Sequence, residues 1–561
     1  MKKLPWVFLV LFLLGAGVRA INVWHPADRS SWRECDEAGI ARNFYREGMN
    51  IFYPRVDWRG DTPGYAEMEF PLFPWLTAVL YKIFGYQEYL GRVVSFTFSL
   101  LTLGVFFLLA RYLLPNVGAI TAAAFFTFNP IFIYISNSLQ PESIMFFFYL
   151  LAAYCFLRWY EEDKLGYFWI SCAATALTIL SKATAAHLGI FFALLVIHKY
   201  GWKVFIQFRL WIFAFLALIP NILWYLHSHH FWLQYGNSLG VSNEYHWIGF
   251  DFFTNKEFIV GIMRNEILYA LMPTGIILIL AGIYSGFKTK VVTYSLFWLI
   301  AVYSYYFIAS RTTGDQWAFY YHIASIPAFS LLMGNGVVVI SKMLTRQNLI
   351  YLLSLVSTLL AIPVAALAHY KFSGNLSQVA WVVSLALIST ALASLFLKNQ
   401  TSLAVDNKSG LVFGSILAYL LLFGLCGTLL FESRQIVADA KIWSEQNQHD
   451  CVEKFAQLIP REDLILVTGG ICRDDDGYPV AYNASFMFLW MDRKGFNVCI
   501  EEQSLEVVSR FAKRGAKYYL VAKKTLQPKK AFEKDLLRVY PLQAQCEDYY
   551  LFKLTPHSFL E

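Results

Sequence analysis

Long apolar runs separated by short polar stretches are the feature that most constrains this chain. A helix that crosses a membrane needs about 20 predominantly apolar residues. Runs of this kind recur from the N-terminus to residue 431. They predict a bundle of about thirteen membrane-spanning helices, near residues 5–20, 90–112, 117–135, 143–159, 166–181, 185–198, 207–226, 266–286, 291–308, 319–340, 348–369, 377–397 and 410–431.

The composition agrees with a membrane protein. Only 15% of the 561 residues are charged and 57% are hydrophobic, whereas soluble domains carry about 25% charged residues. The net charge of +7 is not gathered into a basic block, so nucleic acid is excluded as a partner and the membrane is expected instead. The first apolar run resembles a signal peptide, but the many later spans favour a retained helix.

Lysine and arginine punctuate the apolar runs in a way that predicts their orientation. With the N-terminus in the cytoplasm, the internal loops hold most of these residues, as the positive-inside rule requires. An odd number of spans then places residues 432–561 outside. The compact loops and the Met-Lys-Lys start favour a bacterial inner membrane, with the tail in the periplasm or outside the cell.

Two domains follow from this pattern. Residues 1–431 form the membrane domain, with a long external loop at 21–89 carrying two interfacial helices and a second external loop at 227–265. Residues 432–561 return to soluble composition. There the runs LILVTGG and KYYLVAKK alternate with the helical stretch SLEVVSRFAKRG, which predicts a small α/β domain. Nucleotide-binding and HExxH motifs are absent from the sequence.

The cysteines and histidines do not indicate a metal site. Four cysteines of the tail lack CxxC spacing and allow up to two disulfides in three pairings; they are Cys451, Cys472, Cys499 and Cys546. His227, His229 and His230 resemble a metal cluster only by composition, and solvated loop histidines are the favoured interpretation.

The first external loop carries the most informative stretch, SWRECDEAGIARNFYREG. Ser31 and Glu34 form a capping box that starts a helix. An apolar stripe along this helix is expected to lie on the membrane surface; it consists of Trp32, Cys35, Ile40 and Phe44. Asp36 lies one turn before Ile40, near the edge of the stripe, where desolvation would raise its pKa and its basicity. The alternative is that Asp36 and Glu37 are a solvated face paired with Arg33 or Arg42.

The same loop continues as a Pro-broken extended segment that leads into a second short helix. Arg55 lies in this segment, and Glu69 precedes Phe70 and Pro71 on a rigid turn at the membrane boundary. Arg55 and Glu69 are candidates for substrate binding, although a purely structural role for Glu69 is the stronger interpretation when that residue is taken alone.

Together these motifs resemble the GT-C superfamily of membrane glycosyltransferases, in the branch of protein O-mannosyltransferases and aminoarabinose transferases. The likeness rests on the Asp-Glu pair, the acidic-aromatic-Pro segment and the helix ending in an aromatic-Gly. It implies transfer of a sugar from a polyprenyl-phosphate carrier at the external face, with Asp36 as the acid/base residue. Glu69 departs from the Lys-Pro-Pro of the aminoarabinose transferases, so lipid A need not be the acceptor.

Later segments follow the order of the same family. Glu142 follows a proline at an external span end and is a candidate to position the acceptor or a metal. Lys182 at the next external turn resembles a lysine near the carrier phosphate. A Tyr-rich segment before a proline supplies Tyr320, Tyr321 and His322 as possible phosphate contacts. NASFMFLWMDRKGF in the tail resembles a Phe-x-x-x-Arg-Lys-Gly segment of some relatives. The alternatives are a helix-starting acid for Glu142, an interfacial anchor for Lys182 and an aromatic belt for the tyrosines.

The predicted reaction is hexosyl or pentosyl transfer with inversion. Asp36, helped or replaced by Glu37, would deprotonate the acceptor hydroxyl, and Lys182 would stabilise the departing phosphate. The acceptor is left open among lipid, glycan and protein; no cofactor is implied, and a divalent cation stays an open alternative. The rival classes are a secondary transporter or lipid flippase, which would place ionisable groups at the bilayer midplane, and a non-catalytic scaffold.

Overall fold

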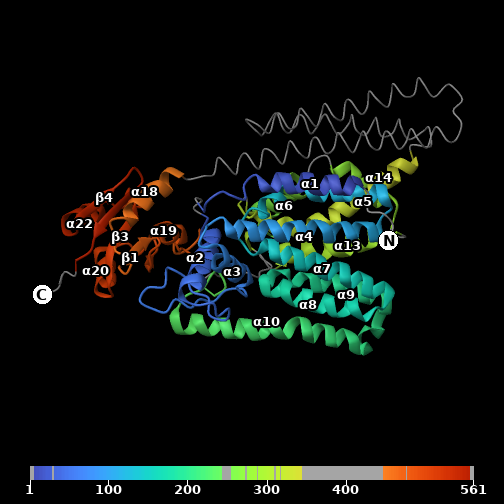
Figure 1. The fold of residues 1–561 in the computed structure, drawn as a ribbon, viewed down its shortest axis with the longest axis horizontal. Coiled ribbons are helices and arrows are strands. Elements are labelled where there is room, and N and C mark those ends of the chain that lie inside the picture. Colours follow the sequence, from blue (N-terminus) through green and yellow to red (C-terminus); the bar gives the residue numbers. More distant parts are fainter. Residues whose placement is uncertain are drawn as a thin grey trace, which may run out of the picture.

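A computed structural model describes residues 6–27, 31–242, 254–271, 275–286, 289–308, 311–315, 317–343, 446–475 and 477–555. A helical body occupies most of the chain, and a small α/β domain lies beyond α2 at one end of it (Figure 1). The predicted spans at 348–369, 377–397 and 410–431 lie outside the described residues.

The helical body begins with α1 (Trp6–Ala20), which packs on α4 and α5; the ring of Phe8 stacks on that of Phe107. The helices that follow the first external loop have the bounds α4 (Leu90–Leu113), α5 (Asn116–Phe128), α6 (Pro130–Ile135), α7 (Glu142–Glu162), α8 (Leu165–Ser181), η1 (Ala183–His187), α9 (Leu188–Tyr200), η2 (Gly201–Ile206), α10 (Phe208–Tyr235), α11 (Lys256–Asn265), the π-helix η4 (Glu266–Leu271), α12 (Gly275–Tyr284), α13 (Lys290–Ile308), η5 (Arg311–Gly314), η6 (Phe319–Ser325) and α14 (Ile326–Met343).

Apolar packing explains which helices sit inside. Five stretches of the described chain are long and apolar enough to cross a membrane, and they differ widely in burial. The stretch that joins η6 to α14 is mostly buried, whereas α10 points Phe215, Leu223 and Leu226 outward. Large apolar side chains exposed in this way suit a helix in contact with lipid tails.

Several predicted spans differ from the structure in detail. The run 117–135 is broken into α5 and α6 because Asn129 caps α6 and Pro130 occupies its first turn. The run 266–286 begins as a π-helix over Glu266–Leu271, and its described part from Gly275 is the α-helix α12. The predicted second loop 227–265 is helical in part, since α10 continues to Tyr235 and α11 starts at Lys256.

The first external loop contains two helices, α2 (Trp32–Glu47) and α3 (Leu72–Phe84), as predicted. The expectation that the apolar stripe of α2 lies on the membrane surface is wrong. Cys35, Ile40 and Phe44 are buried in one cluster with residues of α3 and of the soluble domain. Protein packing, and not lipid, therefore covers this face of α2.

The soluble domain contains a five-stranded sheet in the order β2-β1-β3-β5-β4. β1 pairs in parallel with β2 and β3, while β5 is antiparallel to β3 and β4. The elements are α18 (Gln446–Ala456), β1 (Leu464–Thr468), α19 (Ser485–Met491), β2 (Gly495–Val498), α20 (Leu505–Lys513), β3 (Ala516–Ala522), α21 (Lys523–Leu526), α22 (Lys530–Val539), β4 (Leu542–Gln545) and β5 (Tyr549–Lys553).

Disulfides close this domain in one of the three pairings that the sequence allowed. Cys451 of α18 is bonded to Cys546 beside β5, and Cys472 is bonded to Cys499 after β2. The first bridge joins segments 95 residues apart and the second 27 residues apart. The predicted α/β domain and its strands at LILVT and KYYLVA are thus present in the structure.

Candidate active site

Helix α2 carries the acidic pair. It starts after Ser31, whose hydroxyl accepts a hydrogen bond from the backbone N–H of Glu34 at 3.4 Å. This is half of the predicted capping box. Asp36 and Glu37 follow one turn later and, being adjacent, point to different sides of the helix. Both carboxylates are buried, so the interpretation as a solvated face is wrong.

Asp36 is 3% exposed and is held from one side by an indole. Trp58 Nε1 donates to its Oδ1 at 2.7 Å. Its Oδ2 has no hydrogen-bond partner within the described chain. Burial raises the pKa of Asp36 to about 7, although the Trp58 N–H, the Ser485 hydroxyl and the Arg33 charge act in the opposite direction. At neutral pH the group therefore exists in both protonation states.

Glu37 lies on the side of α2 that faces Arg33 and Glu69. Arg33 Nη2 is 3.1 Å from Glu37 Oε1 and makes a direct ion pair with Glu69. Burial raises the pKa of Glu37 to about 8, and the carboxylates of Glu69 and Glu142 raise it further against the opposing charge of Arg33. Burial would also raise the pKa of Glu69, but the charges of Arg33 and Lys182 outweigh it and keep that pKa below its ordinary value.

Lys182 and Glu142 form an ion pair at the ends of α8 and α7. Glu142 is the first residue of α7, after Pro141, and Lys182 follows the last residue of α8. The Lys182 Nζ lies 4.2 Å from the ring centre of Tyr321 and 5.6 Å from that of Tyr320. The backbone N–H of Phe70 donates to Leu180 O at 2.9 Å, which ties the Glu69 segment to the end of α8.

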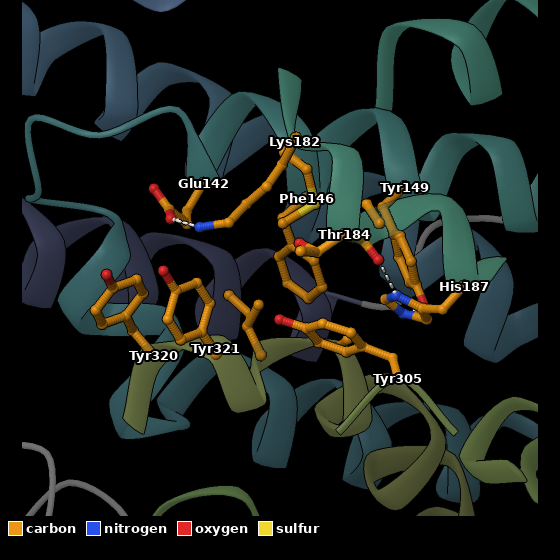
Figure 2. Close-up of a pocket in the computed structure, with 13 residues that line it drawn as sticks. Glu142, Phe146, Tyr149, Lys182, Thr184, His187, Tyr305, Tyr320 and Tyr321 are labelled. Carbon is orange, nitrogen blue, oxygen red and sulfur yellow. Dashed lines mark hydrogen bonds and ion pairs between the residues drawn. The ribbon is translucent and has the colours of Figure 1, made fainter. Parts of the chain in front are cut away.

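A small pocket opens at this ion pair (Figure 2). Lys182 and Glu142 meet at one end, with Tyr320 and Tyr321 below them, and Tyr305, Tyr149 and His187 lie at the other. The full lining is Glu142, Met145, Phe146, Tyr149, Lys182, Thr184, Ala185, His187, Tyr305, Tyr320, Tyr321, Ile323 and Ala324. One cation among aromatic and aliphatic walls suits an anionic headgroup attached to an apolar chain.

Four of the residues predicted for substrate binding meet at this pocket; they are Glu142, Lys182, Tyr320 and Tyr321. Glu69 does not line the pocket, but it pairs with Arg33, and the charge of the pocket residue Lys182 lowers its pKa. Asp36 does not line the pocket; its neighbour Glu37 is joined to Glu69 by Arg33.

His322 and Arg55 do not line this pocket. Their positions therefore do not support the predicted contact with a substrate headgroup there. The ring of His322 is fully buried, with Nδ1 2.5 Å from Glu266 Oε1 and Nε2 2.8 Å from Thr313 O. Arg55 Nη2 donates to the Tyr65 hydroxyl at 3.3 Å, and its Nε is 3.7 Å from Glu47. Both ring nitrogens of His322 and two of the three nitrogens of the Arg55 guanidinium thus have partners in the protein.

The histidines of α10 are not gathered around a metal site. His229 Nδ1 is 2.8 Å from Glu67 Oε1, and His227 Nε2 is 3.0 Å from Phe52 O. Within the described residues, the groups with metal-ligand spacing are in the soluble domain: an exposed acidic cluster at His449 and a group containing the disulfide-bonded Cys472.

Three contributors to the site were missed from the sequence. Arg33 was expected only as an ion-pair partner, yet it joins Glu37 to Glu69, and its spacing of four residues before Glu37 was the available signal. Trp58 and Ser485 contact Asp36 from distant segments, and no local pattern marks either residue.

Comparison with known proteins gives one family match. Residues 62–224 match the family model described as dolichyl-phosphate-mannose-protein mannosyltransferase. This segment includes Glu69, Glu142 and Lys182. An uncharacterized protein of Aquifex aeolicus is 29% identical over 198 residues, which are 33% of this chain and 35% of that protein. The matched segment thus spans about a third of that relative.

Solved structures with the same fold cover nearly the whole chain. ArnT from Cupriavidus metallidurans in the apo state matches with a TM-score of 0.58 and 17% identity, over 98% of both chains. The same protein bound to undecaprenyl phosphate gives 0.57 and 14%, over 98% of this chain and 97% of that one. An Archaeoglobus fulgidus oligosaccharyltransferase tethered to an acceptor peptide gives 0.51 and 13%, over 97% and 74%. The GT-C resemblance is confirmed, and at these identities it concerns the fold.

Proposed function

From this shared fold and the family match we propose that the chain is a membrane glycosyltransferase, which moves a sugar from a polyprenyl-phosphate carrier to an acceptor hydroxyl. The observation that carries the proposal is the Lys182 pocket, which lies beside a buried acidic pair and inside the segment that matches a mannosyltransferase family. A relative of the same fold binds undecaprenyl phosphate, which supports a carrier of this class.

Lys182 is the donor-phosphate ligand in this proposal. Its ammonium is paired with Glu142 in the structure and lies against the faces of Tyr320 and Tyr321. A phosphate entering the pocket would take the place of the Glu142 carboxylate, since both are anions with oxygen acceptors. The tyrosine hydroxyls supply further donors, and the apolar lining faces the start of the lipid chain.

Asp36 is the better general base of the acidic pair. A base needs a pKa near the working pH and a free oxygen within reach of the proton. Asp36 has a pKa of about 7 and one oxygen without a partner within the described chain. Glu37, with a pKa of about 8 and Arg33 beside it, is mostly protonated at neutral pH. Glu37 is therefore not assigned as the base. We assign Arg33 and Glu37 an electrostatic role between Asp36 and the charged residues Glu69 and Lys182.

The chemical step is a single displacement. The acceptor hydroxyl gives its proton to the Asp36 carboxylate while its oxygen bonds to the anomeric carbon of the sugar. The bond from that carbon to the carrier phosphate oxygen breaks, and its electron pair stays on the phosphate, whose added charge Lys182 stabilises. Attack opposite the leaving group inverts the anomeric carbon.

The acceptor stays open among a lipid, a glycan and a protein. Glu69 stands where aminoarabinose transferases carry lysine, and here it binds Arg33. The orientation is part of the proposal: the soluble domain lies outside the cytoplasm, as its two disulfides suggest, because such bonds persist in oxidising compartments.

A secondary transporter is the alternative class. The buried Glu266–His322 pair, with Ser325 and Tyr303 bonded to the same carboxylate, is the kind of ionisable group that transporters use. Substrate flux across sealed vesicles without formation of a glycosylated product would favour this class over the transferase.

The test offers radiolabelled polyprenyl-phosphate sugars to the purified protein with membrane extract and identifies the labelled product. Asp36→Asn is expected to abolish transfer while leaving expression and membrane insertion intact. Asp163→Asn is the matched control, since Asp163 is an exposed cap of α7 with φ of 52°, a conformation that asparagine tolerates. Near-normal turnover by Asp36→Asn would refute the assignment.

A further inference from the structure

The soluble domain lies beside the first external loop (Figure 1), and hydrogen bonds join the two. Arg42 of α2 donates to the carbonyl of Leu489 in α19 at 2.9 Å and pairs with Asp57 at 2.7 Å. The backbone N–H of Gly60 donates to Gly495 O at 2.6 Å, and that of Gly495 donates to Asp57 O at 3.1 Å. The loop therefore extends the edge of the sheet at β2.

Glycine at position 60 permits this approach. Gly60 has a φ of +60°, and a side chain there would run into the ring of Phe496 on β2. The domain contact is thus made by backbone at close range and by buried side chains, including the Trp490 indole, which donates to Ala27 O at 2.7 Å.

Asp36 lies beside residues of both parts of this interface, which joins the first external loop to the soluble domain. Trp58, which lies between Asp57 and Gly60 in the segment held against β2, donates to Asp36 Oδ1. Ser485, the first residue of α19, is 2% exposed, and its hydroxyl lies beside Asp36. Ser485 Oγ and Asp36 Oδ2 are both buried, and both lack a hydrogen-bond partner in the described part of the chain.

We infer that the soluble domain is a working part of the active site, in which Trp58 and Ser485 are the positioning residues that orient Asp36 and favour its charged form. The inference rests on the proposed role of Asp36 as the base. Neither residue touches the reacting atoms. They act through Asp36, and Ser485 does so from the domain at the other end of the sequence.

The charges around Asp36 explain why such donors are needed. Arg33 on the same helix favours the carboxylate, whereas the charge of Asp57 opposes it. Arg42 pairs with Asp57 while it binds the α19 carbonyls of Leu489 and Phe488. From α19 itself, the group that faces Asp36 is the Ser485 hydroxyl. A buried carboxyl without N–H and O–H donors would stay protonated at neutral pH and fail as a base.

Two variants with matched controls test this inference. Trp58→Phe removes the indole N–H that donates to Asp36, and Ser485→Ala removes the hydroxyl that lies beside it. Trp75→Phe removes an indole N–H that binds Met49 O at 2.9 Å in the same loop, and Ser504→Ala removes a serine that caps α20 in the same domain. The acid limb of the kcat/KM profile is expected to move up by about one pH unit in Trp58→Phe, less in Ser485→Ala, and not at all in the controls.

A second measurement keeps this test independent of turnover. A carbodiimide labels buried carboxyls only when they are protonated, and mass spectrometry of the peptide separates Asp36 from Glu37. The labelling midpoint of Asp36 is expected to shift with the kinetic limb. An unchanged midpoint and pH profile with only a lower kcat would overturn the inference. If Asp36→Asn stays active, the proposed function fails, while a shifted midpoint would still show that the two residues tune Asp36.

Discussion

Removing the Lys182 ammonium separates two effects that the structure predicts for this side chain. Lys182 neutralises the buried Glu142 carboxylate and, in the proposed function, binds the donor phosphate. Lys182→Met keeps much of the aliphatic stem and removes the charge. Breaking a buried ion pair by removing one partner costs about 3–5 kcal/mol, because Glu142 would be left charged without compensation or would have to take up a proton.

The affinity for the carrier is expected to fall by a different amount. A charge-assisted hydrogen bond contributes about 1.5–3 kcal/mol, which corresponds to about a 10- to 150-fold weaker binding of the polyprenyl phosphate. The double variant Lys182→Met with Glu142→Gln removes both charges. It is expected to recover most of the lost stability and none of the lost affinity.

Thermal unfolding in nanodiscs and titration with polyprenyl phosphate measure the two effects on the same samples. Glu142→Gln alone serves as the control, since it leaves the Lys182 ammonium free for phosphate and should bind the carrier at least as tightly as the native chain. The reasoning is refuted if Lys182→Met binds the carrier with unchanged affinity, or if the double variant regains affinity together with stability.

Two further predictions concern Asp36 and the disulfides. Because burial raises the pKa of Asp36 from about 3.9 in an unfolded chain to about 7, this group favours folding below about pH 4 and loses that contribution as the pH rises through 7. At pH 8, Asp36→Asn should therefore be more stable than the native protein, with a free energy of unfolding higher by up to about 4 kcal/mol and a higher unfolding temperature. At pH 4 the two proteins should differ little. Equal changes at pH 4 and pH 8 would contradict the burial argument. For the soluble domain, peptide mapping without reductant should recover Cys451 joined to Cys546 and Cys472 joined to Cys499; free thiols at these positions would argue against an external location. The double variant Cys451→Ser with Cys546→Ser should lower the free energy of unfolding of the domain by about 2–5 kcal/mol.

The features that the sequence predicted well are those written in local patterns. Apolar runs predicted the helices of the bundle, and Ser31 predicted the start of α2. The apolar runs LILVT and KYYLVA, which alternate with polar helical stretches, predicted β1 and β3. The convergence of Glu142, Lys182, Tyr320 and Tyr321 followed from the order of short family motifs. The breaks at Asn129 and the length of α10 were missed because they depend on capping and packing within the bundle.

Features that depend on contacts between distant segments escaped the sequence. The stripe on α2 has the spacing of an interfacial helix, and only the presence of α19 and α3 turns it into a protein core. His322 follows two pocket tyrosines in sequence, yet its ring does not line the pocket, because it is hydrogen-bonded to Glu266 of another helix. Disulfide pairing and the placement of Ser485 have the same origin, since nothing in the local sequence encodes which distant segment will be the neighbour.

The division of labour between the two domains follows from what each environment can supply. The helical bundle offers an aromatic-lined pocket, and the buried Lys182 there needs a counter-charge when no phosphate is bound, a role that Glu142 fills. A base has the opposite requirement, because it must lose its proton despite burial. That demands a donor with fixed geometry, which the described site supplies through Trp58 on a loop held by the sheet edge, with the Ser485 hydroxyl of α19 beside the same carboxyl. Under the proposed function, a chain that kept the bundle but lacked the docked domain would still bind the carrier, but it would transfer the sugar poorly.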